Sequence, residues 1–119
     1  MKPRTMTSMV VSAVASAACV AGCAATTPAP SDQWAAANEQ IGRATATAPA
    51  VPDAKLHLQL AQEDLQKSKA LIGNDNHRAF TLTEVARAEA QLALSLASQA
   101  QADAQARMAQ GELSKATTH

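Results

Sequence analysis

The chain has 119 residues, of which 47% are hydrophobic and only 2% aromatic, and 10 basic side chains balance 10 acidic ones. The zero net charge and the lack of a Lys/Arg cluster argue against nucleic acid or an anionic lipid surface as a partner. Alanine is the commonest residue, and it has the highest helix propensity but buries little area. We therefore expect one small all-helical domain with a thin core.

The N-terminal segment has the pattern of a bacterial lipoprotein signal. Two basic residues precede an apolar run over residues 9–21, which is too short to span a bilayer. Residues 20–23 (Val-Ala-Gly-Cys) follow, in the order of a secretory signal whose cleavage leaves a cysteine to carry lipid. The sequence predicts a signal peptide over residues 1–22 and acylation of Cys23.

Two other interpretations of this cysteine stay open. An ordinary signal peptide could end here and leave a cysteine by coincidence, or Cys19 could carry the lipid. Cys19 fits less well, because Ser16 stands where a branched apolar residue is expected. Cleavage before Cys23 leaves a single cysteine, so no disulfide within the mature chain is possible.

Residues 23–31 are rich in Pro, Thr and Ala and predict an extended, lipid-anchored tether. Eight extended residues reach at most ~28 Å, so the helical domain over 32–119 is expected close to the membrane. Anchoring must come from acyl chains, since the mature chain has no basic cluster. Ala24 stands where an aspartate would favour retention in the inner membrane. We therefore expect a protein anchored in the outer membrane and facing the periplasm.

Two helices are predicted before the middle of the domain. The first spans about 32–47, with Ser31 or Asp32 as its N-cap, and the prolines of residues 48–52 end it. Its apolar stripe at 3–4 spacing consists of Trp34, Ala37, Ile41, Ala44 and Ala48. The second spans about 52–72 and is apolar on two sides, which predicts that it is the central helix. One side holds Ala54, Leu58, Ala61, Leu65, Ser68 and Ile72, and the other Leu56, Leu60 and Leu71.

A third, longer helix is predicted from about Asn76 past Met108, as far as about Leu113. Gly73 suits a left-handed C-cap before it, and Asn74-Asp75-Asn76 supplies a turn and an N-cap. Its seam of small residues at 4–3 spacing consists of Ala79, Thr83, Ala86, Ala90, Ala93, Ala97, Ala100 and Ala104, flanked by Leu82, Val85, Leu92 and Leu96. Such a seam lets two helix backbones approach closely.

The unequal helix lengths allow two architectures. Either the first helix folds back to make a short antiparallel three-helix bundle, with residues after about Ala100 projecting, or the first two helices lie end to end along the third. We favour the bundle, because Trp34 and Ile41 need apolar partners and the second helix offers Leu56 and Leu60.

The order of these elements resembles a family of short, alanine-rich helical envelope lipoproteins catalogued as a domain of unknown function. In that family a lipobox precedes a helix that ends at an Ala-Pro break. A segment beginning Pro-x-x-x-Leu follows, then a Gly/Asn/Asp turn and a long alanine-rich helix. The corresponding residues here are 48–49, 52–56, 65–69, 73–75 and Ala79 onward, so the resemblance covers about residues 31–105. It implies an envelope lipoprotein, and the family has no settled activity.

The sequence offers little catalytic chemistry. His57, His77 and His119 lie in different segments, none at i,i+4 from another His or Cys, so we expect all three to be exposed and no metal to be bound. Glu89 interrupts the leucine stripe of the third helix and is either functional or satisfied by Lys or Arg of a neighbouring helix. The chain has no nucleophile elbow and no glycine-rich phosphate loop. We predict no cofactor, no small-molecule substrate and no enzymatic activity.

Two functions are therefore compatible with the sequence. The first is a structural or scaffolding, non-catalytic role in the cell envelope, with the membrane as partner through Cys23 and with self-association or a protein partner on the helical faces. The alternative is a lipidated adaptor or regulator that binds a periplasmic enzyme or envelope complex.

Overall fold

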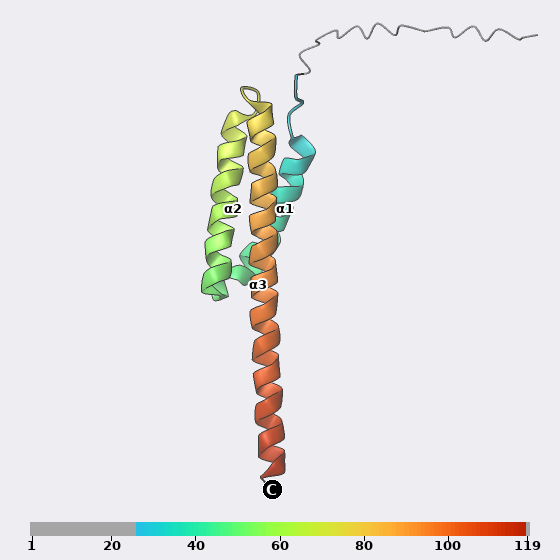
Figure 1. The fold of residues 1–119 in the computed structure, drawn as a ribbon, viewed down its shortest axis with the longest axis vertical. Helices are drawn as coiled ribbons and strands as arrows, with labels where there is room; N and C mark the ends of the chain where they lie inside the picture. Colours follow the sequence, from blue (N-terminus) through green and yellow to red (C-terminus); the bar gives the residue numbers. More distant parts are fainter. Residues whose placement is uncertain (1–25, 119) are drawn as a thin grey trace, which may run out of the picture.

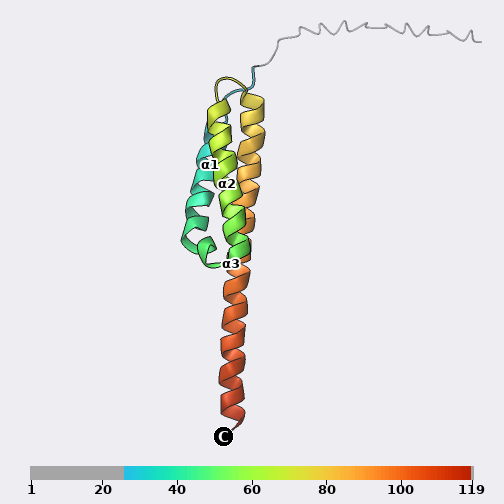
Figure 2. The same cartoon turned by 90° about the vertical axis from the view of Figure 1, so that its left-hand side faces the viewer.

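The computed structural model describes residues 26–118. The predicted signal peptide, Cys23 and His119 lie outside them. The elements in chain order are α1 (Ser31–Thr47), the 3₁₀ turn η1 (Ala48–Ala50), α2 (Pro52–Leu71) and α3 (Asn76–Thr117). In Figure 1, α1 runs downward, α2 runs upward and α3 runs downward again. The all-helical prediction is confirmed, and α1 folds back to make a three-helix bundle (Figure 2).

Local chemistry explains where the first two helices meet. The proline at position 49 has no N–H to continue α1, and a single 3₁₀ turn follows in its place. Pro52 then occupies the first turn of α2, as predicted. The predicted cap of α1 is wrong, since the helix already includes Ser31 and Asp32. Its N-cap is Pro30, without a side-chain cap, and the Pro30 carbonyl accepts from the N–H of Trp34 at 2.8 Å.

The turn between α2 and α3 forms as its sequence predicts. Gly73 has a φ of 90°, which a residue with a Cβ adopts only under strain. Asp75 caps α3 by accepting a hydrogen bond from the backbone N–H of Arg78 at 3.0 Å. The chain therefore reverses over four residues, and α3 starts antiparallel to α2.

Alanine dominates the core, as the composition predicts. The buried side chains are Ala37, Ile41 and Ala44 of α1, Ala48 of η1, Ala54, Leu58, Ala61, Leu65 and Ser68 of α2, and Ala79, Thr83, Ala86, Ala90, Ala93 and Ala97 of α3. Only three of them are large aliphatic residues, each worth about 1.5–3 kcal/mol when buried. The stability of the bundle therefore depends on close approach of the helices along α3.

The central helix is α3, and the expectation that α2 would be central is wrong. α3 packs against both other helices, whereas α1 and α2 contact each other much less. The small residues of α3 let two neighbours approach it, while Leu56 and Leu60 of α2 are exposed and do not cover α1. The reason given for the bundle was therefore wrong, although the bundle itself is correct.

The C-terminal part of α3 extends beyond the bundle, as predicted. Every residue over 101–118 is exposed except the half-buried Gly111. The helix has 42 residues, against 20 in α2 and 17 in α1, and continues to Thr117 rather than ending near Leu113. At 1.5 Å per residue it is about 63 Å long, and Figure 2 shows its lower half without a neighbour.

Candidate interaction surface

The histidines occupy different environments. His77 is exposed in the first turn of α3, as predicted, whereas His57 is half-buried, so its predicted exposure is wrong. His57 Nδ1 lies 2.5 Å from Glu89 Oε2, and each side chain is 27% exposed. The predicted partner of Glu89 was a Lys or Arg, but the antiparallel register brings His57 to it instead. The sequence held one indication that these two residues could meet, because each lies beside the stripe of its helix that packs against the other helix.

The pair joins two rows of large apolar side chains. We define the leucine edge as Leu56, Leu60 and Leu71 of α2 together with Leu82, Val85, Leu92 and Leu96 of α3. Leu60 lies one helical turn from His57, and both Val85 and Leu92 lie one turn from Glu89. Because His57 contacts Glu89, the two rows lie beside each other along one side of the bundle.

The leucine edge is only partly covered. The exposed fractions are 54% for Leu56, 38% for Leu60, 41% for Val85 and 42% for Leu92. The same chain builds its core mostly from alanine, so its larger aliphatic side chains lie disproportionately at the surface. A contiguous patch of this kind is typical of a protein interaction site.

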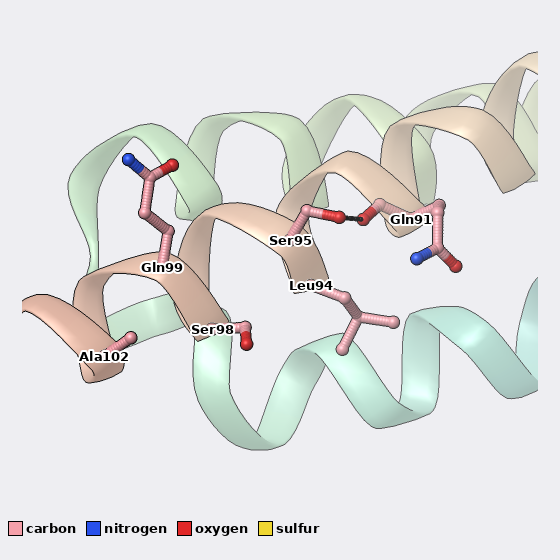
Figure 3. A pocket seen from close by; sticks show the side chains of 6 residues that line it. All are labelled: Gln91, Leu94, Ser95, Ser98, Gln99 and Ala102. Atoms are coloured by element: carbon pink, nitrogen blue, oxygen red, sulfur yellow. Dashed lines mark hydrogen bonds between the residues drawn. The ribbon is translucent and has the colours of Figure 1, made fainter.

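α1 covers the opposite side of the α2–α3 pair. The Lys69 ammonium lies 5.9 Å from the centre of the Trp34 ring, and Leu94 packs against the core and points toward α1 (Figure 3). Lys69 lies nine residues after Leu60, and Leu94 lies nine residues after Val85. Nine residues are two and a half helical turns, so Lys69 and Leu94 lie on the sides of their helices opposite the leucine edge. α1 therefore leaves this edge free within the described residues.

A shallow hollow beside α1 offers little chemistry. It is lined by Gln91, Leu94, Ser95, Ser98, Gln99 and Ala102 (Figure 3). The Ser95 hydroxyl donates to the Gln91 carbonyl at 3.0 Å, so its hydrogen bond stays within α3 and is not made to a base. Neither an acid nor a histidine lines this hollow, so nothing in it activates a nucleophile.

Ser68 and Thr83 form the one buried polar contact between helices among residues 26–118. Both are fully buried, their hydroxyl oxygens lie 2.6 Å apart, and each also lies 2.8 Å from the Ala79 carbonyl oxygen. The sequence placed both in apolar stripes but gave no sign that they would meet. The contact fixes the register of α2 against α3 and is closed to ligands.

Residues 26–118 offer neither a metal-binding cluster nor a membrane-spanning helix. No group of three or more His, Cys, Asp or Glu side chains there could hold a metal ion. None of the described helices is both long and apolar enough to cross a membrane.

No family model, curated protein or solved structure matches this chain. Its most distinctive surface is the leucine edge, and its second is the projecting part of α3. Both are suited to contacts with helices of another protein, because each presents a long, continuous helix face.

Proposed function

We propose that this chain is a lipid-anchored scaffold of the outer membrane that faces the periplasm and binds protein through its leucine edge, without a catalytic step. The observation that carries this function is the exposure of Leu56, Leu60, Val85 and Leu92 on a bundle whose core is mostly alanine. Burying large aliphatic side chains is the main source of free energy in protein association. The exposed parts of these four side chains thus offer a partner apolar area to bury.

The anchor belongs to the same proposal and is supported by the order of residues 20–23 and by the resemblance to alanine-rich envelope lipoproteins. The Asn76 side chain donates to the Thr27 carbonyl at 2.8 Å, so the start of the described chain lies beside the α2–α3 turn. Lipid on Cys23 would therefore attach at this end of the bundle. α3 would then point away from the membrane and reach about 60 Å into the periplasm.

Metabolic labelling with a palmitate analogue, followed by separation of the two membranes, tests the anchor. The full chain is expected to carry label and to fractionate with the outer membrane. The Cys23→Ala variant is expected to lose both, while the matched Cys19→Ala variant retains them. Label that persists in the Cys23→Ala variant would contradict the assignment of this cysteine.

The alternative function, an adaptor for a periplasmic enzyme or envelope complex, is favoured by the projecting part of α3. About five turns of this helix have no neighbour in the bundle, and they carry exposed Met108 and Leu113. A photo-crosslinking residue at Met108 tests this function in cells. Capture of one discrete protein there, with none captured from Leu60, would favour the adaptor over the scaffold.

A further inference from the structure

We infer that the leucine edge binds a second copy of this chain, about a two-fold axis parallel to α3, so that α2 of each copy packs against α3 of the other. This inference deepens the proposed scaffold and rests on it for the orientation of the two copies. The result is a four-helix core made of two α2 and two α3 helices, with each α1 on the outside. In Figure 1, α1 lies behind α3 and so leaves the front of the α2–α3 pair open to the second copy.

The register within one copy already aligns the apolar side chains for this packing. The contacts of His57 with Glu89 and of Ser68 with Thr83 fix the heights of α2 and α3 relative to each other. In that register Leu56 lies level with Leu92, and Leu60 lies about one helical turn from the height of Val85. A two-fold axis parallel to the helices keeps these heights, so Leu56 of one copy faces Leu92 of the other, and Leu60 lies between the heights of Val85 and Leu92 of the other copy.

The area of this face is sufficient for a dimer. α2 has 20 residues and is therefore about 30 Å long, and two adjacent helices present a face about 20 Å wide. Each copy would bury about 600 Å², or about 1,200 Å² in total, which reaches the lower limit for specific protein interfaces. A partner with only one helix would cover about half of this face.

The polar groups of the edge tolerate burial against a second copy. Asp64 of α2 and Glu89 of α3 are carboxylates within the edge, and Glu89 already makes a hydrogen bond to His57 of its own chain. Lys67 lies between Leu60 and Leu71 in the α2 row, is paired with Glu63 at 2.8 Å and lies 3.6 Å from Asp64. These carboxylates and this ammonium therefore keep a partner when water leaves the interface.

The two-fold axis parallel to α3 also agrees with the proposed anchor. The described chain starts beside the α2–α3 turn, where Asn76 holds Thr27. Under this symmetry both chain starts lie at the same end of the dimer, so both tethers reach one membrane. An axis perpendicular to α3 would place them at opposite ends.

Photo-crosslinking of the full chain in cells, from one position at a time, tests this interface. Leu60 and Leu92 are expected to give a product that contains only this chain at twice its mass. Arg43, on the exposed side of α1, is expected to give none. Capture of another protein from Leu60 and Leu92 would overturn the second copy while leaving the proposed scaffold in place. An absence of products from both positions would overturn both proposals.

Native mass spectrometry of the detergent-purified full chain adds a second measure. A Leu60→Gln change is expected to lower the association constant about tenfold, which corresponds to about 1.4 kcal/mol. Leu113→Gln, at a site 66% exposed and away from the edge, is expected to leave it unchanged. Circular dichroism shows whether each variant stays helical, and the dimer fraction of the unmodified chain in the same measurement needs no variant to fold. A monomer up to about 100 µM, or equal dimer fractions in both variants, would overturn the interface.

Discussion

Ser68 and Thr83 meet across the α2–α3 interface with their hydroxyl oxygens 2.6 Å apart, and both also contact the carbonyl oxygen of Ala79. Two hydroxyl hydrogens serve three contacts, so only two of the three are hydrogen bonds at any moment. Either hydroxyl can donate to Ala79 while the other donates within the pair. One hydroxyl thus partly replaces the other when it is lost.

Ser68→Ala and Thr83→Val are each expected to lower the free energy of unfolding by about 1 kcal/mol. In a domain of this size that corresponds to a fall in Tm of about 4–8 °C. The double variant should cost more than the sum of the two, because the hydroxyl that remains in each single variant still donates to the Ala79 carbonyl and the double variant loses that bond as well. Thermal unfolding of the four proteins at one concentration measures this coupling, and strictly additive costs would contradict the shared network.

Gly42 and Gly73 make a matched pair, because both have open space around them but only Gly73 has a positive φ. Gly42 lies inside α1 with nothing near the position of a Cβ, so Gly42→Ala is expected to stabilise the protein by about 0.5–1 kcal/mol. Gly73 also has open space around it, but its φ of 90° is strained for a residue with a Cβ. Gly73→Ala should therefore destabilise the protein by about 1–2 kcal/mol. The midpoint of urea unfolding checks both, and a shift of the two variants in the same direction would contradict the assignment of the turn.

The features of the fold that depend on neighbouring residues could be predicted from the sequence, whereas those that depend on packing between helices could not. The break at Pro49 and the turn at Gly73 depend on a few neighbouring residues, and both formed as expected. The central helix depends on which stripe of α2 meets a partner, and both stripes are apolar, so the sequence alone does not rank the two choices. The small residues of α3 decided it, because they permit two close neighbours whereas Leu56 and Leu60 do not.

The surface was harder to predict than the fold. Whether His57 is exposed depends on the register of α2 against α3, and this register is set by contacts between residues far apart in the chain, such as Ser68 with Thr83. The sequence identified Glu89 as unusual and identified both leucine rows. It did not show that the rows share one edge, because that follows only from the contact of His57 with Glu89 across α2 and α3.

The His57–Glu89 contact is expected to couple α2 to α3. Both side chains are mostly buried, so a double-mutant cycle with His57→Ala and Glu89→Ala should give a coupling of about 0.5–1.5 kcal/mol. Each single variant also leaves the other group without its partner, so each should lower the Tm. Additive effects of the two changes would contradict this contact.

The exposed Glu63–Lys67 pair provides the control. The hydrogen bond from Lys67, together with its charge, holds the pKa of Glu63 below its ordinary value. A lowered carboxyl pKa stabilises the folded state above the ordinary pKa, and that stabilisation is lost as the pH falls through the folded value. Solvent screens this exposed pair, so Glu63→Gln should leave the Tm at neutral pH unchanged. A clear loss there, absent at low pH, would show that the pair matters more than its exposure indicates.

The seam of α3 gives the sharpest test of the bundle, because the same stripe is buried in one part of the helix and exposed in another. Ala93 is fully buried against its neighbours, whereas Ala104 continues the stripe beyond the bundle and is exposed. Ala93→Glu places a charge and four extra side-chain heavy atoms where helices are in contact, and should cost at least about 3 kcal/mol. Ala104→Glu has the same helix propensity cost and should change stability by less than about 0.5 kcal/mol. Circular dichroism of the two variants compares them directly. An Ala104→Glu variant as unstable as Ala93→Glu would mean that the projecting part of α3 is also packed, and would place a partner on that half of the helix instead of on the leucine edge.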